Sequence, residues 1–440
     1  MRRENQGGRR FACLLSVLLG LIFCRYALQV NIPRAVFLGI LTVMAVWGTQ
    51  TEILALFLTL IPLHESVDFY YALLICLGIY VWKYYRKIRI HPAVLLVLGL
   101  ILWELLHCFS PELSFLEILI PILPLLVLAV VLASDLSETD YGFLIRAFAS
   151  STASIGITML GQVLYWCDFN LVRTAAQLRR LGVVLESSGG RSAITGGTIQ
   201  TNSLGIICVL AITGLLQLRS VRQNRTSDTV LILLLLTLGA LTSSRTFLLC
   251  LAMAVFLFVL GQEGGFSRKL RFFGCLAVLG ALVLVLMQLF FPELLEYYVG
   301  RFSERDITTG RDVLMQRYHR FIIRNPKVLY FGIGLQSYGH KLTEGYRVAS
   351  NVPHNSIQEV LIAWGLPGLL LCAALVLAMM GKAGKGKLLN YIPLVILLFK
   401  SMAGQLLTSG YSLLALTYCY LSLGQDFNPG EKKGNLTNWV

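Results

Sequence analysis

Long apolar runs separated by short polar connections recur from one end of this 440-residue chain to the other. A membrane-spanning α-helix needs roughly 20 predominantly apolar residues to cross the hydrocarbon core of a bilayer. The strands of an outer-membrane barrel would instead alternate apolar and polar residues over about 10 positions. These runs do not alternate, and 56% of all residues are hydrophobic while only 14% are charged. The sequence therefore predicts an all-α polytopic integral membrane helix bundle.

The apolar runs divide the chain into predicted helices and loops. In chain order they are 11–29, 35–48, 51–63, 69–83, 92–109, 114–133, 141–166, 202–218, 229–244, 246–262, 271–291, 355–381, 388–407 and 411–424. Because three of them are short, we predict 12–14 transmembrane helices, and whether 35–48 and 51–63 both span stays open. One membrane domain would cover 1–440, with a first external loop at 167–201 and a large external loop at 292–354.

The distribution of basic residues predicts the orientation. If every run crosses the membrane and the N-terminus is cytoplasmic, the cytoplasmic segments hold more than half of the 37 basic residues. The short external connections at 30–34, 64–68, 110–113 and 408–410 hold one, Arg34. Short cytoplasmic loops are typically enriched in Lys and Arg. Both termini are therefore expected in the cytoplasm, and the net charge of +14 reflects membrane orientation rather than nucleic-acid binding.

The large external loop contains a predicted amphipathic helix near 311–324. Its apolar side chains recur at helical spacing on one face, namely Leu314, Tyr318, Phe321 and Ile322. Its basic side chains form a stripe on another face, namely Arg317, Arg320 and Arg324. We expect this helix on the outer membrane surface, where its basic face either binds substrate or only meets solvent and lipid headgroups. Arg311 opens the helix, and helix N-termini attract anions.

Three further places carry polar residues at predicted external positions. Arg191 lies in a glycine-rich segment, 187–197, before the next helix, and Arg245 lies at a Ser-Ser-Arg tip between two helices. His354 and Asn355 stand where the large loop re-enters the membrane, and Glu359 follows one turn later. Each position has an alternative structural interpretation, as a polar hairpin tip or as a helix cap.

Several charged residues fall within or near the apolar runs: Glu104, His107, Glu117, Arg146 and Lys400. Charged groups at hydrocarbon depth are costly and usually face a cavity or a partner. A role in a substrate pathway and a role in a structural ion pair are equally compatible with the sequence. No Cys or His pair has the spacing of zinc ligands, so no metal site is expected.

The order of these features resembles a known family. In chain order they are the glycine-rich loop with Arg191 followed by Asn202, the tip at Arg245, Gly310-Arg311 opening the loop helix, Pro326 with Gly332 and Gly334, then His354-Asn355 and Gly365. This ordered set, from about residue 180 to 370, resembles the O-antigen ligase and O-antigen polymerase superfamily of bacterial polytopic membrane glycosyltransferases. The resemblance implies a GT-C-like fold in the bacterial inner (cytoplasmic) membrane.

The resemblance also implies an activity on the external membrane face. Such enzymes move a glycan from undecaprenyl pyrophosphate to an acceptor hydroxyl with inversion, and use neither a metal ion nor another cofactor. The acceptor is lipid A core in ligases and a second lipid-linked repeat unit in polymerases. An O-antigen, capsule or exopolysaccharide polymerase is favoured over a ligase because polymerases occur more widely.

The candidate residues fit this chemistry. Arginine forks match phosphate oxygens and would stabilise the negative charge that develops on the pyrophosphate leaving group. The candidates for this role are Arg191, Arg245 and Arg311. His354 is the candidate base for the acceptor hydroxyl, with Glu359 orienting it across a helical turn. Secondary candidates are Arg305, Asn355 and Arg317.

Three other functions remain open at this stage. A polyprenol-linked oligosaccharide flippase or another transporter would place functional charges at mid-bilayer in matching halves of the chain. A peptidoglycan-type polymerase would use an acidic residue of the large loop, for which Asp306 and Asp312 are available. A non-enzymatic scaffold would leave the set of arginines unexplained. The sugar, its linkage and the oligomeric state are not encoded in any pattern that we identify.

Overall fold

The computed structural model describes residues 2–63, 67–108, 115–170, 201–220, 225–242, 244–262, 265–290, 292, 295–296, 299–300, 311–335, 353, 355–382, 388–402, 404 and 410–423. The helices are α1 Arg2–Tyr26, α2 Arg34–Trp47, α3 Gln50–Thr59, α4 Val67–Tyr84, α5 Pro92–His107, α6 Phe115–Ala133, α7 Tyr141–Trp166, α11 Thr201–Ser220, α12 Thr226–Leu241, α13 Arg245–Gly261, α14 Phe266–Phe290, α16 Arg311–Arg324, α17 Pro326–Phe331, α19 Ser356–Lys382, α20 Leu388–Met402 and α21 Gly410–Leu423. Short 3-10 helices follow α3 (η1, Ile61–Leu63) and α4 (η2, Tyr85–Lys87).

The described part of each apolar run predicted from the sequence lies mainly on one of these helices. Among the described residues, four helical stretches are long and apolar enough to cross a membrane, at Tyr141–Trp166, Ser203–Ser220, Phe266–Leu286 and Ser356–Gly381, and shorter apolar helices accompany them. The prediction of an all-α polytopic membrane protein is confirmed. Of the two short runs, 35–48 forms the 14-residue α2, and 51–63 forms the 10-residue α3 continued by η1.

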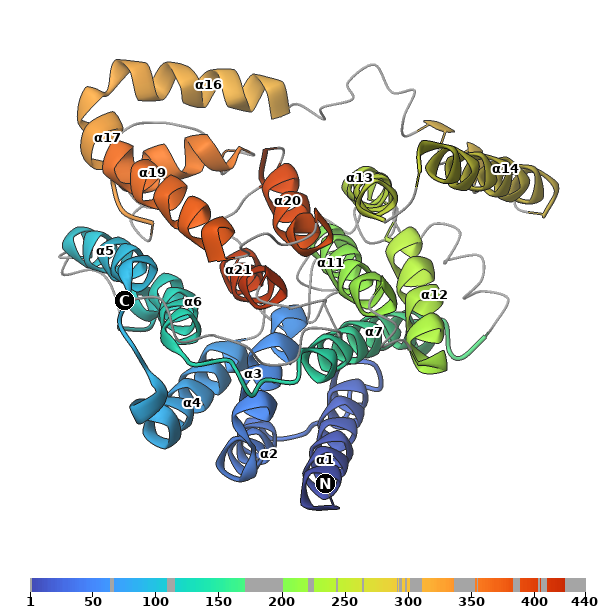
Figure 1. Ribbon diagram of the computed structural model, residues 1–440, viewed down its shortest axis with the longest axis horizontal. Helices are drawn as coiled ribbons and strands as arrows, with labels where there is room; N and C mark the ends of the chain where they lie inside the picture. Colours follow the sequence, from blue (N-terminus) through green and yellow to red (C-terminus); the bar gives the residue numbers. More distant parts are fainter. Residues whose placement is uncertain are drawn as a thin grey trace.

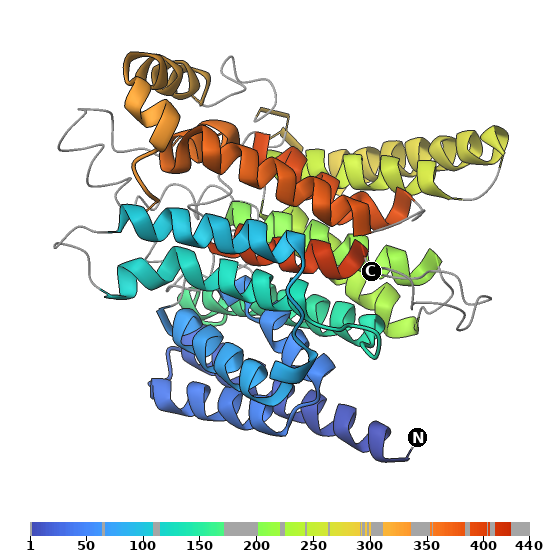
Figure 2. The ribbon, with the colours of Figure 1, turned by 60° about the vertical axis from the view of Figure 1, so that its left-hand side comes forward.

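The helices lie side by side in a bundle (Figures 1 and 2). In Figure 2, α16 and α17 occupy the upper left-hand end of the bundle, and the N-terminus lies at the right-hand end. We call the end where α17 lies the α17 end, and the end where η2 lies the Lys87 end. Helix α5 connects them, because it begins shortly after Lys87 and ends at His107 beside Phe331.

The centre of the bundle consists of helices that are buried on nearly all sides. Almost every residue of α3 and α21 is buried, as is most of α11. Outer helices instead expose large apolar side chains, for example Trp47 of α2, Leu102 of α5 and Leu233 of α12. An apolar side chain at the periphery of a membrane-spanning bundle faces lipid tails rather than water. Helix α14 lies at the edge in Figure 1, with exposed apolar side chains along its length.

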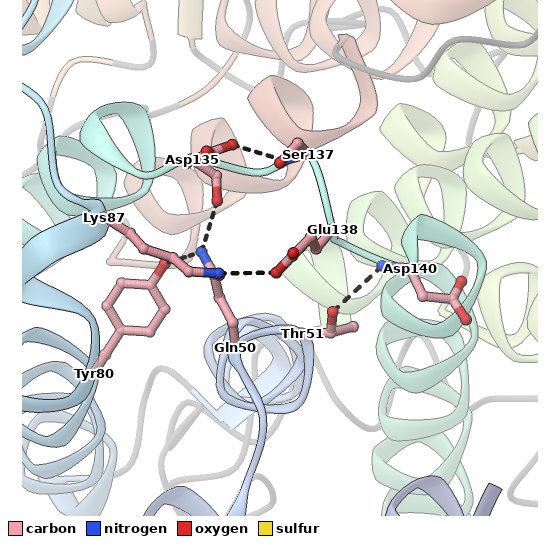
Figure 3. A network of polar contacts seen from close by, with 8 residues as sticks. All are labelled: Gln50, Thr51, Tyr80, Lys87, Asp135, Ser137, Glu138 and Asp140. Carbon is pink, nitrogen blue, oxygen red and sulfur yellow. Dashed lines mark hydrogen bonds and ion pairs between the residues drawn. The ribbon is translucent and has the colours of Figure 1, made fainter. Parts of the chain in front are cut away.

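A network of polar contacts joins neighbouring elements at the Lys87 end (Figure 3). The Gln50 amide donates to the Tyr80 hydroxyl at 3.0 Å and to the Asp135 carbonyl at 2.8 Å. Lys87 donates to the Glu138 carboxylate at 2.9 Å, and this hydrogen bond raises the pKa of the Lys87 ammonium. These contacts join α3 and α4 to the connection between α6 and α7. The basic residue Lys87, which the sequence assigns to a cytoplasmic loop, therefore also has a structural role.

Helix α16 covers the residues for which the sequence predicts an amphipathic helix. Tyr318, Phe321 and Ile322 are buried on its apolar face. They form a small hydrophobic cluster with Val328 and Ile333 after the helix and with Ile362 of α19. The apolar face of α16 is thus covered by the protein's own side chains and not by lipid. This packing fixes α16 across the α17 end of the bundle.

Candidate functional site

The structure describes only some of the residues that the sequence proposes for the site. Arg191, Arg305 and His354 lie outside the described residues, and so does the side chain of Arg311, although Arg311 is the first residue of α16. Arg245 is the first residue of α13 and is partly buried. Arg317 is exposed on α16. Asn355 and Glu359 lie at the beginning of α19 and are buried.

Asn355 fixes the beginning of α19. Its Oδ1 atom accepts hydrogen bonds from the backbone N–H groups of Ile357 and Gln358, at 3.0 and 3.2 Å, as an N-cap side chain does. Its Nδ2 atom donates to the Met402 carbonyl at the end of α20, at 3.2 Å. The neighbouring Ser356 hydroxyl donates to the Gly404 carbonyl at 3.1 Å. Asn355 therefore has the capping role that the sequence left as an alternative.

Helix α16, which belongs to the large predicted external loop, also contacts the beginning of α19. The Gln358 amide of α19 donates to the Met315 carbonyl of α16 at 2.9 Å. Arg311 precedes Met315 by one helical turn, about 6 Å along the axis. Figure 1 shows the beginning of α16 above the region of α20 and α13. The backbone of Arg311 thus lies in the neighbourhood of the first turn of α19.

A buried ammonium group contributes from α20. Lys400 is 8% exposed, donates to the Ser412 hydroxyl of α21 at 3.3 Å, and lies 5.0 Å from the centre of the Tyr411 ring. Helix α20 packs against α13, the helix that carries buried Cys250. Arg245 precedes Cys250 by five residues, about 7.5 Å along the helix axis. The beginnings of α13, α19 and α21 and the end of α20 therefore meet at the α17 end.

Glu359 places a carboxylate in this region. Its side chain is fully buried in the first turn of α19, and its backbone N–H donates to the Asn355 carbonyl at 3.0 Å. We call the set Asn355, Ser356, Gln358, Glu359 and Lys400 the α19-start cluster. It combines a cation, a carboxylate and neutral donors in a region largely shielded from solvent, where electrostatic interactions are stronger than in water. Its amide, hydroxyl and ammonium donors bind oxygen atoms of α16, α20, α21 and Gly404, so the set connects the beginning of α19 to these parts of the bundle.

The other buried charges have separate roles. Arg146 of α7 forms an ion pair with Asp228 of α12, toward the Lys87 end. His107 of α5 contacts Phe331 at the end of α17, and Glu104 of α5 accepts a hydrogen bond from Leu335 after it. The side chain of Glu117 lies outside the described residues. Within the described part of the chain, no group of three or more His, Cys, Asp or Glu residues is placed to hold a metal ion.

Sequence reasoning missed part of the α19-start cluster. Ser356 and Gln358 carry no recognisable signal, because serine and glutamine are common at helix ends. Lys400 did carry one, as a charge inside an apolar run. Its neighbours became visible only in the fold, which brings residues from α13, α20 and α21 together.

Comparison with known proteins identifies one matching family. Residues 230–373 match the model of the family described as O-antigen ligase. The matched segment begins in α12 and ends within α19, and it includes Arg245, Arg311, Asn355 and Glu359. No curated protein and no solved structure matches the chain. The family match supports membership of the O-antigen ligase and polymerase superfamily and confirms the resemblance found in the sequence.

Proposed function

We propose that this member of the O-antigen ligase and polymerase superfamily is a bacterial surface-polysaccharide glycosyltransferase of the inner membrane. It moves a glycan from undecaprenyl pyrophosphate to an acceptor hydroxyl on the external face, with inversion and without a divalent metal ion. We favour an O-antigen, capsule or exopolysaccharide polymerase, whose acceptor is a second lipid-linked repeat unit, over an O-antigen ligase.

The α19-start cluster is the observation that carries this proposal. Buried Lys400 lies on α20, which packs against α13 and α21. The hydrogen bonds from Asn355 to Met402 and from Gln358 to Met315 connect the beginning of α19, which carries buried Glu359, to α20 and α16. Of these helices, α13, α16 and the first two thirds of α19 lie in the segment that matches the O-antigen ligase family, whereas α20 and α21 follow it. In the orientation that the charge distribution predicts, this end of the bundle lies near the external membrane surface, where a lipid-linked donor presents its pyrophosphate.

The proposed mechanism assigns charge stabilisation to arginine. Cleavage of the sugar–pyrophosphate bond leaves negative charge on the phosphate oxygens, and planar guanidinium forks bind such oxygens with two hydrogen bonds. Arg191, Arg245 and Arg311 take this role, with Arg305 and Arg317 as further cations of the loop. Preorganised donors of this kind stabilise the transition state because they need no reorganisation during the reaction.

The acceptor hydroxyl needs a base near neutral pH. His354 takes this role, since the ordinary pKa range of histidine lies close to neutrality. Glu359 orients His354 across one helical turn, and Asn355 holds the beginning of α19 in place through its bonds to Met402 and to the first turn. The proton of the hydroxyl passes to His354 as the hydroxyl oxygen attacks the anomeric carbon.

Reconstitution of the purified protein tests this function. We expect proteoliposomes supplied with undecaprenyl-pyrophosphate-linked repeat units, in the presence of a chelator, to release undecaprenyl pyrophosphate and form longer glycans with inverted anomeric configuration. Transfer to lipid A core instead would identify a ligase. Passage of the intact lipid-linked glycan across the bilayer without a new glycosidic bond would reject the proposal in favour of a flippase. Activity with lipid-linked peptidoglycan precursor alone would indicate a peptidoglycan-type polymerase.

A further inference from the structure

A fully buried carboxylate, that of Glu104 on α5, joins three distant parts of the chain. The backbone N–H of Leu335, in the segment after α17, donates to both of its oxygens, at 3.1 and 3.0 Å. The indole Nε1 of Trp364 on α19 donates to Oε2 at 2.6 Å. The Cys108 thiol lies 3.8 Å from Oε1. A buried carboxylate is tolerated only when hydrogen bonds replace its lost hydration, and here the donors come from the loop and from α19.

At this junction, further hydrogen bonds to backbone carbonyls of α19 connect it to the loop segment and to α5. The N–H groups of Ile333 and Gly334 donate to the carbonyls of Ile362 and Ala363 on α19, at 2.9 and 2.8 Å. The Trp103 indole of α5 donates to the Trp364 carbonyl at 2.9 Å. The loop segment therefore lies against α19 while α5 holds Trp364 at both its side chain and its carbonyl.

The His107 ring closes the same junction. Its Nε2 atom lies 2.9 Å from the Phe331 carbonyl, and its Nδ1 atom lies 2.7 Å from the Trp103 carbonyl. We call residues 331–335 the return segment. Its first carbonyl contacts α5, its middle N–H groups contact α19, and its last N–H binds Glu104. The return segment is thus bound along its whole length.

Helix α19 is broken at this point. Gly365 has φ 66° and ψ −165°, so the helix divides into a first half, Ser356–Trp364, and a second half that continues to Lys382. A Cβ atom at Gly365 would lie 2.7 Å from the backbone of Tyr330. At the break, the backbone of Tyr330, just before the return segment, packs directly against Gly365. The break also separates the half of α19 that carries Glu359 from the half that continues through the bundle.

We propose that Glu104 is a positioning residue for glycosyl transfer, an inference that rests on the proposed function. Through Trp364 it fixes the end of the first half of α19, and through Leu335 it fixes the return segment that follows α16 and α17. Asn355 and Glu359 lie at the other end of the same half-helix, and Arg311 opens α16. Glu104 itself lies on α5 and acts only through these elements.

Two substitutions test the role of Glu104. Glu104→Leu removes the acceptor, and Glu104→Gln retains one acceptor oxygen at nearly the same size. We expect faster hydrogen exchange at the Ile333, Gly334 and Leu335 amides in Glu104→Leu and near wild-type protection in Glu104→Gln. Small misplacement of reacting groups costs up to about 10²-fold in rate, so kcat in Glu104→Leu should fall by about that factor. The KM for the donor should change far less, and Glu104→Gln should restore most of the kcat.

Asp228→Asn is the matched control, because it weakens a buried charge pair toward the opposite end of the bundle. We expect it to lower the melting temperature while leaving kcat and exchange of the return segment unchanged. If Glu104→Leu does not accumulate, Trp364→Phe removes a single hydrogen bond to Glu104 and should reduce kcat without loss of folded protein. Wild-type kcat in Glu104→Leu or in folded Trp364→Phe, measured below their melting temperatures, would overturn the positioning role.

The exchange measurement separates this inference from the proposed function. Absence of transfer by the wild-type protein would reject both the function and the positioning role, even if Glu104→Leu loosened the return segment. Normal transfer by the wild type together with unchanged exchange in Glu104→Leu would reject the positioning role alone. Transfer by the wild type with loosened exchange and reduced kcat in Glu104→Leu would support both.

Discussion

The guanidinium group of Arg146 on α7 binds the carboxylate of Asp228 on α12 at two points, with Nε–Oδ1 at 2.9 Å and Nη2–Oδ2 at 3.1 Å. The Asp228 side chain is almost fully buried, and its Oδ2 also accepts from the Arg225 N–H at 2.7 Å. Of the two roles that the sequence allowed for Arg146, the structure supports the ion pair. The pair fastens α7 to α12 far along the bundle from the α19-start cluster.

Loss of this pair should affect stability and not transfer. Breaking a buried ion pair by removing one partner typically costs about 3–5 kcal/mol, because the other charge stays buried. We expect Asp228→Ala to lower the melting temperature of the purified protein strongly. The double variant Arg146→Met with Asp228→Ala should recover part of the loss. Equal stability of Asp228→Ala and the wild type would contradict the structural role.

The predicted orientation can be tested at two exposed positions at opposite ends. Lys327 on α17 and Arg268 near the beginning of α14 are both exposed. In a background without the ten native cysteines, a membrane-impermeant thiol reagent should label Lys327→Cys in intact cells with a permeabilised outer barrier. It should label Arg268→Cys only after cell lysis. The reverse pattern would place both termini outside and overturn the orientation predicted from charge.

Replacement of arginine by lysine tests the pyrophosphate site. Lysine keeps the charge of Arg191, Arg245 or Arg311 but loses the planar fork. Removal of one preorganised donor to a developing oxyanion typically costs 10²–10³-fold in kcat, and we expect about this loss for each variant. Arg324→Lys, at the exposed end of α16, is the control and should transfer normally. Full activity of Arg245→Lys would remove that residue from the proposed set.

His354→Ala tests the proposed base. General-base assistance contributes about 10²–10⁴-fold, so turnover should fall by that range while binding of the lipid-linked donor persists. His319→Ala, which changes an exposed histidine of α16, should behave like the wild type. A His354→Ala protein that keeps its turnover and only melts earlier would assign His354 to helix capping, and Glu359 would become the next candidate base.

The break in α19 predicts contrasting effects of two glycine substitutions. Gly365→Ala would force a side chain into a positive-φ conformation, which costs roughly 1–3 kcal/mol, and would bring its Cβ against the Tyr330 backbone. Gly99→Ala on α5 meets only the Leu371 side chain, at 3.7 Å, and should be neutral or stabilising by up to about 1 kcal/mol. Thermal unfolding of the two variants provides the measurement. A stable Gly365→Ala protein would mean that α19 can continue unbroken.

The positions of the helices were predictable because the bilayer imposes a strong local rule. The predicted run 141–166 coincides with α7, since a helix that crosses lipid must carry its apolar residues in one contiguous stretch. The run 355–381 also predicts α19, but not its division at Gly365. Gly365 and Pro367 within the run permit such a break, but the packing of the chain into it depends on the return segment and on Trp103, which lie elsewhere in the sequence.

The candidate site was predictable to a smaller extent. Asn355 and Glu359 follow from their place at the entry to an apolar run, and Arg311 from the start of an amphipathic helix. The contact between Gln358 and Met315 and the place of Lys400 beside Ser412 required the fold, because they join residues of separate helices. The convergence of Arg191, Arg245 and Arg311 on one pyrophosphate stays a prediction.

The hydrogen bonds of Glu104 also determine the order in which parts of this protein can reach their final structure during synthesis. Leu335 and Trp364 follow Glu104 by 231 and 260 positions. At a synthesis rate of about 5–20 residues per second, roughly 10 to 50 seconds pass between emergence of the carboxylate and emergence of these partners. During that interval α5 resides in the membrane while Glu104 lacks the N–H donors of Leu335 and Trp364. The first third of the chain therefore enters the bilayer in a provisional arrangement, and the ribosome must complete α19 before α5 can reach its final state.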